Sequence, residues 1–172
     1  VGEVRTVLTG MVKAISTARN YLYLQTPYFM PDESFLLASK SAALSGVDVR
    51  LMVPEKADSW LAGYATRSYL MDIMRAGVKV YLYREGFLHS KTFVCDDYLS
   101  SVGSVNLDFR SFYYNFEVSA FVYGKSVARE LKEQFLEDTK SCRLLTPSGF
   151  MAERSFKERC AESVARLFSP LL

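Results

Sequence analysis

Apolar residues recur along this chain with two alternating periods, one typical of helices and the other typical of strands. Spacings of three and four residues indicate amphipathic helices, and short runs of β-branched and aromatic residues indicate buried strands. The pattern predicts helices over residues 4–19, 31–45, 57–76, 126–138 and 151–168. It predicts strands over residues 21–26, 47–53, 78–83, 92–95, 98–102 and 115–123.

The order of these elements predicts an α/β fold. Strands that alternate with helices form a sheet with helices on both faces. The turn expected at Asp96-Asp97 adds antiparallel pairing, so the sheet should be mixed. The 172 residues suffice for one full core and contain no repeat or linker, so we expect residues 1–172 to form a single domain.

Composition and charge exclude several classes of protein. Apolar residues make up 49% of the chain, which excludes a disordered protein, and the net charge of +2 does not indicate nucleic-acid binding. No apolar run approaches the roughly 18 residues of a membrane span, so we expect a soluble piece. Three widely spaced cysteines fit reduced thiols. Because the chain opens on Val1 without a methionine, we expect a fragment of a longer protein.

The candidate chemistry is centred on residues 88–97, around the only histidine of the chain, His89. Lys91 follows two positions later, and on a strand these two side chains would share one face. A lone histidine is commonly a packed or solvent-facing residue without chemistry. Lys91, Asp96 and a Gly-Ser-x-Asn segment at fixed offsets favour a reactive histidine instead.

This combination is typical of phosphoryl or phosphatidyl transfer. A neutral imidazole such as that of His89 is a competent nucleophile at phosphorus, and the Lys91 ammonium would neutralise a phosphate oxygen. Ser104 and Asn106 would donate to other phosphate oxygens, while Gly103 would let the backbone come close.

Two acidic residues near the motif are expected to have different roles. Asn115 and Glu117 would share a strand face. Glu117 could orient His89 by accepting the N–H of its second ring nitrogen. Alternatively, Glu117 is a surface residue at the end of a strand without a role in the site. Asp96, although part of the motif, is expected to hold local structure because a carboxylate repels phosphate.

The residues after Asn106 leave two alternatives open. Asp108 and Arg110 could form an ion pair that braces the loop, or Arg110 could bind a lipid phosphate with both ends of its guanidinium. A metal site is not expected, because the chain has one histidine and its motif has no cluster of carboxylates.

These residues carry a resemblance to a known family. The spacing resembles the HKD motif of the phospholipase D superfamily, in the pattern His89-x-Lys91-x4-Asp96 followed by Gly103-Ser104-x-Asn106. Residues 107–111 and 115–117 resemble the second catalytic half of bacterial cardiolipin synthases, and the resemblance extends from Thr26 to the last residue. It implies an α-β-α sandwich in which His89, Lys91, Asp96 and Glu117 belong to the active site.

The resemblance also implies an activity and its partners. One phosphatidylglycerol would be attacked by a histidine, glycerol would leave, and the phosphatidyl group would pass to a second phosphatidylglycerol. A second histidine would come from the first HKD half of the same parent protein, at the bacterial inner membrane, without metal or organic cofactor. Tyr28 and Arg67 resemble pocket-lining residues of this family, and Arg110 and Asn115 are further pocket candidates.

Two other functions remain open. A single HKD motif per chain could serve a phosphodiesterase that works as a homodimer, as in small nucleases of the superfamily, or the chain could be a non-catalytic interaction module. The carboxy-terminal helix would place Phe156, Cys160, Val164 and Leu167 on one side. We expect that helix to pack on its own domain rather than on a missing half or a membrane. We also expect the chain to expose an apolar patch where the missing half docks.

Overall fold

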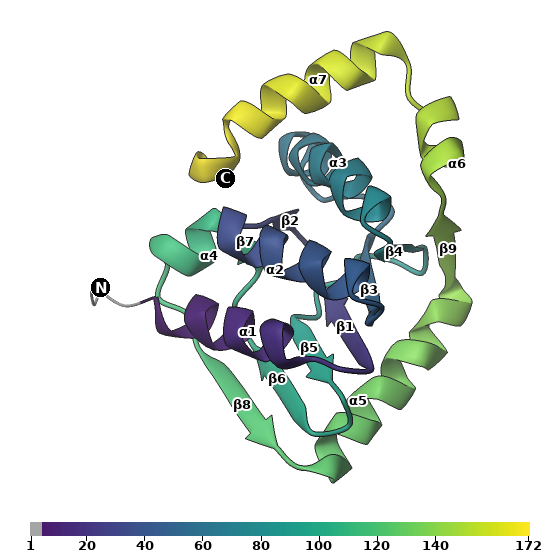
Figure 1. The fold of residues 1–172 in the computed structure, drawn as a ribbon. Helices are drawn as coiled ribbons and strands as arrows, with labels where there is room; N and C mark the ends of the chain where they lie inside the picture. Colours follow the sequence, from purple (N-terminus) through teal and green to yellow (C-terminus); the bar gives the residue numbers. More distant parts are fainter. Residues whose placement is uncertain (1–4) are drawn as a thin grey trace.

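A mixed sheet of seven strands forms the centre of the computed structural model, which describes residues 5–172 (Figure 1). In spatial order its strands are β8 (Ser119–Tyr123), β6 (Leu99–Gly103), β5 (Thr92–Cys95), β1 (Tyr21–Gln25), β3 (Asp48–Pro54), β4 (Lys79–Tyr83) and β9 (Cys142–Leu145). Strands β1, β3 and β4 are parallel, and every other pairing is antiparallel. Strands β2 (Phe29–Met30) and β7 (Leu107–Asp108) form a separate parallel pair. The predicted α/β class with a mixed sheet is confirmed.

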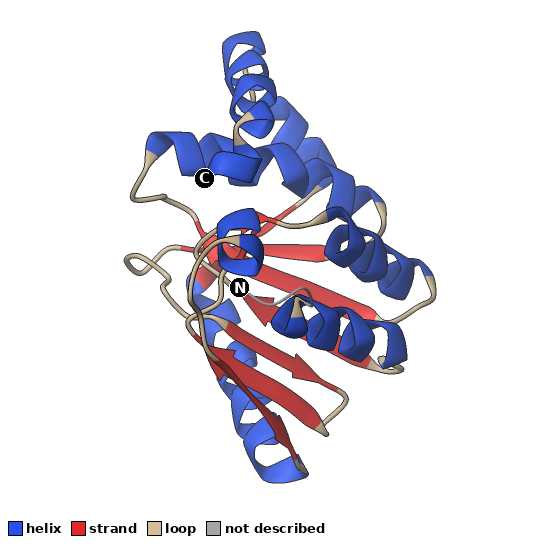
Figure 2. Ribbon diagram, turned by 90° about the vertical axis from the view of Figure 1, so that its left-hand side faces the viewer, coloured by secondary structure: helices blue, strands red, loops and turns tan. Residues whose placement is uncertain are grey.

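Helices lie on both sides of this sheet (Figure 2). They are α1 (Thr6–Thr17), α2 (Glu33–Leu44), α3 (Trp60–Arg75), α4 (Phe109–Tyr113), α5 (Lys125–Asp138), α6 (Pro147–Ala152) and α7 (Phe156–Leu167), with 3-10 turns η1 (Thr139–Ser141) and η2 (Ser169–Leu171). Within residues 5–172, every helix is too short or too polar to cross a bilayer. The first residue of the helix predicted from residue 4 lies outside the described residues.

The alternation of side chains along β1 explains the two cores. Leu22 and Leu24 point into a large core that is covered by α1, α2 and α3. Tyr21 and Tyr23 point to the other face, where Tyr23 stacks on Phe135 of α5 at a ring distance of 4.8 Å. Both faces of this strand are therefore buried, as expected for a strand in the middle of a layered α/β fold.

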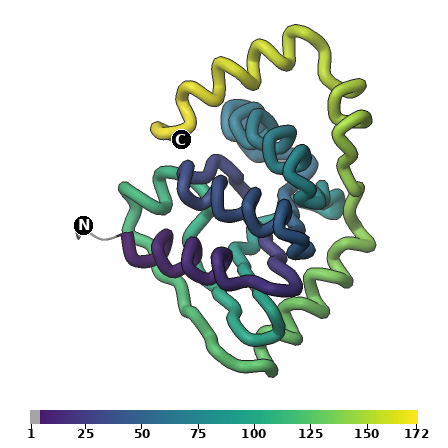
Figure 3. The backbone as a smooth tube through the Cα atoms, in the orientation of Figure 1, coloured from purple at the N-terminus to yellow at the C-terminus, as the bar shows by residue number. Residues whose placement is uncertain are grey.

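The carboxy-terminal part of the chain runs round the outside of the fold (Figure 3). Here the helix predicted over residues 151–168 is confirmed for Phe156–Leu167, but its first residues belong to a separate helix. The chain forms α6, breaks, and starts α7 at a capping box in which Ser155 and Glu158 exchange hydrogen bonds. Helix α7 packs on α3, on the side of α3 away from the sheet (Figure 1).

Two local predictions near the motif are wrong. His89 and Lys91 lie in the connection between β4 and β5 rather than on a strand. Asn115 and Glu117 precede β8, which begins only at Ser119. In both places the strand pattern of the sequence continues beyond the residues that have a hydrogen-bonded neighbour in the sheet.

Candidate active site

The strand directions bring several segments of the motif to one edge of the sheet. Because β5 runs antiparallel to β1, the first residue of β5, Thr92, pairs with the last residue of β1, Gln25. At the same edge, Gly103 at the end of β6 pairs with Ser119 at the start of β8. Residues 89–91, 104–106 and 115–118 therefore all leave or enter the sheet along this edge.

His89 lies exposed at this edge, in the connection before β5. Its ring is 5.8 Å from the ring of Phe87, measured between centroids, at an angle of 31°. The Lys91 ammonium donates a hydrogen bond of 2.9 Å to the His89 carbonyl, which fixes the backbone of the loop. The imidazole is thus open to a ligand, while its main chain is held.

Lys91 is half-buried and lies in the field of two carboxylates. Burial lowers the pKa of the Lys91 ammonium, and the charges of Glu117 and Asp108 oppose this shift. The charge of Glu117 acts on Lys91 although the chain reaches Glu117 only 26 residues later. A cation next to an exposed imidazole is a suitable site for a phosphate group.

Gly103 and Ser104 join the motif to the segment that carries Glu117. The Ser104 N–H donates to the Val118 carbonyl at 2.9 Å, and the Ser104 Oγ accepts from the Val118 N–H at 3.0 Å. A Cβ added to Gly103 would lie 2.2 Å from the Val118 carbonyl oxygen, so only glycine fits this close approach. The glycine is thus required by packing between two strands at the site.

Asn106 is turned toward Asp108. Its N–H donates to Ser111 Oγ at 3.2 Å, and its side chain hydrogen-bonds to the Asp108 carboxylate. Asn106 Oδ1 is buried and has no partner among residues 5–172. Asp108 is 3% exposed and caps α4 by accepting from the Ser111 N–H at 2.7 Å; burial raises the pKa of its carboxyl.

Glu117 and Asn115 lie beside an open depression of about 410 Å³ that Ser104, Phe116 and Val118 also line. Asn115 Nδ2 donates to Glu117 Oε1 at 3.2 Å. The shared strand face proposed for them does not exist, but the two side chains do meet. In residues 5–172 no hydrogen bond joins His89 to Glu117, so this partnership stays a prediction.

Asp96 lies at the opposite end of β5 from Lys91, roughly 16 Å along the strand. Its carboxylate accepts from the N–H groups of Arg19, Asn20 and Tyr21 at 2.6, 2.8 and 2.9 Å. The structure therefore corrects the assignment of Asp96 to the catalytic residues that the motif implies. The carboxylate holds the start of β1 against the β5–β6 turn, which agrees with the expected structural role.

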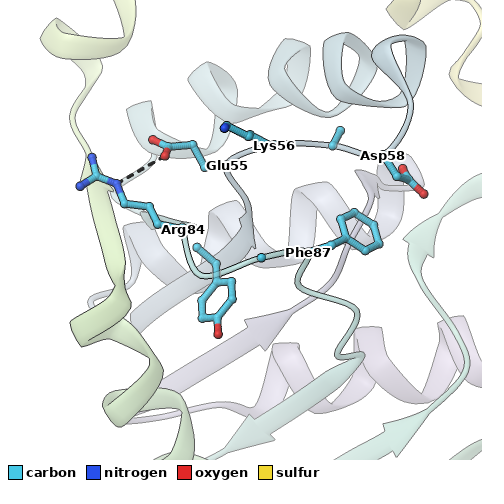
Figure 4. Close-up of a pocket in the computed structure, with 8 residues that line it drawn as sticks. Glu55, Lys56, Asp58, Arg84 and Phe87 are labelled. Atoms are coloured by element: carbon cyan, nitrogen blue, oxygen red, sulfur yellow. Dashed lines mark ion pairs between the residues drawn. The ribbon is translucent and has the colours of Figure 1, made fainter.

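A second hollow, of about 310 Å³, lies next to the histidine loop (Figure 4). The residues after β3 and β4 line it, including Lys56, Asp58 and Phe87. Tyr28 adjoins it: its hydroxyl donates to Asp58 at 2.6 Å, and its ring is 6.4 Å from that of Phe87. Burial and this hydrogen bond raise the pKa of Tyr28 to about 12. The sequence pattern did not predict this hollow, although both segments directly follow predicted strands.

Two of the pocket candidates need separate description. Arg67 lines a small hollow of about 40 Å³ together with Pro27 and Thr66. Arg67 forms an ion pair of 3.2 Å with Glu162 of α7 and lies over the Phe150 ring, so its guanidinium is directed to the carboxy-terminal helix. Arg110 is exposed, and in the described part of the chain it forms no ion pair with Asp108. The bracing alternative is therefore wrong, and binding of a phosphate by Arg110 remains a prediction. Residues 5–172 hold no cluster of three or more side chains suited to a metal ion.

The fold is that of a phospholipase D-like domain. The structure of Nuc from Salmonella typhimurium, a phospholipase D family member, matches with a TM-score of 0.70 at 19% identity, over 83% of this chain and 90% of that one. Phosphatidylserine synthase from Haemophilus influenzae matches with a TM-score of 0.73 at 16% identity, over 94% of this chain and 43% of that one.

Sequence comparison assigns the family. Residues 11–139 match the family described as "Cardiolipin synthase, PLD-like domain", and the chain belongs to this family. It is 46% identical to a cardiolipin synthase of Listeria welshimeri over 99% of this chain and 35% of the relative. It is 45% identical to one of Clostridium perfringens over 96% of this chain and 35% of the relative. The chain thus spans about a third of the length of these relatives.

Proposed function

We propose that this chain is the carboxy-terminal catalytic half of a cardiolipin synthase, which makes cardiolipin and glycerol from two phosphatidylglycerols. One observation carries the proposal: the exposed His89, the half-buried Lys91 and Glu117 belong to one sheet edge, in a chain that is 46% identical to a cardiolipin synthase. The sheet edge supplies an imidazole, a cation and a carboxylate. Those groups are what transfer of a phosphate diester requires.

The proposed reaction has two displacements at phosphorus. In the first, an imidazole nitrogen bonds to phosphorus while the bond to the glycerol oxygen breaks, and a second histidine protonates that oxygen. In the second, the same histidine takes the proton from a hydroxyl of another phosphatidylglycerol, whose oxygen attacks phosphorus and releases the imidazole. Either role is open to His89. The second histidine belongs to the first HKD half of the parent protein.

The rim of the site offers a surface for that first half. Tyr114, Phe116 and Val118 are exposed by 63%, 95% and 72%, next to Ser104 and Glu117. Large apolar side chains grouped at a functional site mark a protein contact more often than an ordinary surface. We therefore place the first half, with its histidine, over these residues.

The test combines the two halves. The first half of the parent protein is co-expressed with this chain or with its His89→Ala or Lys91→Ala variant, and cardiolipin is measured from labelled phosphatidylglycerol. Both variants should reduce product by at least about a hundredfold. Samples denatured with detergent at neutral pH, where the phosphorus–nitrogen bond to histidine survives, then show which half carries the phosphatidyl label. Full activity of His89→Ala would refute the proposal.

A second candidate function is a phosphodiesterase that works as a homodimer. The observation that favours it is that Nuc, a phospholipase D family member, is covered over 90% of its length by this single domain. In that case the chain alone should form a stable dimer with activity toward phosphodiesters. Light scattering after size-exclusion chromatography distinguishes this from an inactive monomer that needs its other half.

A further inference from the structure

Helix α7 is oriented with its polar face inward. Glu162 is 3% exposed and forms ion pairs with Arg154 at 2.7 Å and with Arg67 of α3 at 3.2 Å. Arg166 forms an ion pair of 2.8 Å with Asp72 of α3 and covers the Tyr69 ring. A helix at the edge of a globular domain normally buries its apolar stripe and exposes its charges. Helix α7 packs on its own domain, as expected, but does so through ion pairs.

The apolar stripe of α7 faces outward. Phe156, Cys160, Val164 and Leu167 are spaced by four, four and three residues and so share one side of the helix. Phe156, Val164 and Leu167 are exposed by 79%, 54% and 78%, and Cys160 is exposed as well. Leu171 of η2, exposed by 72%, lies just beyond the helix. Single exposed apolar residues are ordinary, but a continuous stripe of this kind marks a contact surface.

The charges beside the stripe select its partner. Lys157 and Arg159 flank it and are exposed. The two acids of the helix are both occupied: Glu158 accepts from the Ser155 N–H at 2.7 Å, and Glu162 is buried in its ion pairs. Glu158 keeps its negative charge, and the two exposed cations leave a net positive charge beside the stripe. Such a surface complements an anionic partner that also accepts apolar side chains.

We propose that α7 lies on an anionic bilayer surface, with Phe156, Val164 and Leu167 inserted at the boundary between headgroups and acyl chains. Helices with an apolar stripe and flanking basic residues bind membranes in this way. A second copy of the chain fits less well, because both copies would bring a net positive charge to the same interface. The bilayer provides both the apolar medium and the negative charge.

This position would also bring the candidate active site to its substrate. The turn η2, directly after α7, contacts α4, which begins immediately after the motif segment that ends at Asp108. Contact of α7 with lipid would therefore hold the motif near the headgroup region. That last step rests on the proposed function, whereas binding of α7 to lipid does not depend on it.

Binding is measured by flotation of the chain with vesicles of phosphatidylglycerol and phosphatidylcholine, compared with vesicles of phosphatidylcholine alone. The chain should float with the anionic vesicles and remain behind with the neutral ones. The double variant Phe156→Ser/Leu167→Ser should weaken binding by at least about tenfold. Lys157→Glu/Arg159→Glu should weaken it by about tenfold or more. Leu37→Ser, at an apolar position of α2 that is 64% exposed, is the matched control and should bind normally.

Cys160 gives a second measurement that needs no substitution. It is exposed in the stripe, whereas Cys95 is buried and Cys142 is half-buried. Burial raises the pKa of Cys95 to about 12 and that of Cys142 to about 11, so both should react slowly with a maleimide. Anionic vesicles should slow the modification of Cys160 several-fold, as followed by mass spectrometry.

Either of two results would overturn the proposal. One is binding that is equal for the chain and for Phe156→Ser/Leu167→Ser. The other is a chain that ignores vesicles but forms a dimer that this double variant abolishes, which would assign the stripe to a second copy. Because flotation requires no turnover, these results stand apart from the test of phosphatidyl transfer. An inactive chain that still binds through α7 would refute only the proposed reaction.

Discussion

Ser104 and Val118 exchange hydrogen bonds in both directions, of 2.9 Å from the Ser104 N–H to the Val118 carbonyl and 3.0 Å from the Val118 N–H to Ser104 Oγ. Ser104 therefore has a structural role, because it fixes the segment that carries Glu117. Its exposed hydroxyl also donates a long hydrogen bond of 3.4 Å to the Val118 carbonyl, and rotation of this hydrogen would let it donate to a phosphate oxygen instead. Substitutions at this junction should affect the position of Glu117.

Gly103→Ala should disrupt this junction. Its Cβ would lie 2.2 Å from the Val118 carbonyl oxygen, so residues 117–119 would have to move. We expect lower thermal stability, and in the two-half enzyme a loss of activity that exceeds the loss of folded protein. Gly77→Ala is the control for stability alone, because Gly77 has a φ of +98° in a turn without neighbours within 4 Å. If both variants lost activity only in proportion to unfolding, the junction would have no role in the site.

Asp96→Ala should reduce stability and spare catalysis. The change removes the acceptor of three backbone N–H groups and places alanine at a φ of +54°. We expect a loss of about 2 kcal/mol, which lowers the melting temperature by about 4–8 °C in a domain of this size. Asp96→Asn should lose less, because asparagine tolerates this φ and keeps one acceptor. Activity per folded molecule should stay normal, in contrast to Lys91→Ala.

Much of this fold follows from local patterns. The strand Thr92–Cys95 coincides with the predicted one, and helices α2 and α3 end before Gly46 and Gly77, which have positive φ. Strand composition and helix-ending glycines determine structure only within a few residues along the sequence. Strand β9 was not predicted, because it is defined by pairing with β4, as between Val80 and Leu145, which are far apart in the sequence.

The candidate site could be predicted in part, because the spacing of the motif is itself a local signal. The motif spacing identified His89 and Lys91, and strand order brings Glu117 to the same edge. The ion pair of Arg67 was not predicted, because its partner, Glu162, lies 95 residues away and gives no local signal. The sequence pattern also did not predict that the polar face of α7 packs on the domain. Periodicity shows that a helix has two faces, but only tertiary ion pairs decide which face packs.

Asp108→Asn should change how stability depends on pH. Burial raises the pKa of the Asp108 carboxyl, so the folded state holds this proton more tightly than the unfolded chain does. The contribution of Asp108 to stability therefore falls as the pH rises through the interval above its ordinary pKa of 3.8. Asparagine does not titrate and also caps helices well.

The melting temperature of Asp108→Asn, relative to that of the wild-type chain, should therefore increase between about pH 3 and pH 7. Thermal unfolding by circular dichroism at several pH values measures this difference. Glu130→Gln, at an exposed position of α5, is the control and should show no such trend. A constant or decreasing difference would show that the Asp108 carboxylate is not destabilised by burial.

Glu117→Gln should reduce turnover in the two-half enzyme far more than it weakens lipid binding. The carboxylate would act chiefly when His89 becomes cationic, during the displacement and in the phosphatidyl-enzyme, whereas glutamine can still accept an N–H from the neutral ring. An interaction made mainly in the transition state lowers kcat and kcat/KM together. The expected loss is about a hundredfold or more.

The hydrogen bond from Asn115 Nδ2 to Glu117 Oε1 allows variants of Asn115 to be compared with Glu117→Gln. Asn115→Asp would place a second negative charge beside Glu117, whereas Asn115→Ala would only free the carboxylate. If Glu117 acts by orienting His89, Asn115→Ala should lose much less activity than Glu117→Gln. Glu133→Gln, at an exposed position of α5, controls for the loss of one surface charge. A Glu117→Gln enzyme with normal kcat and a changed KM alone would mean that Glu117 contacts the lipid rather than the histidine.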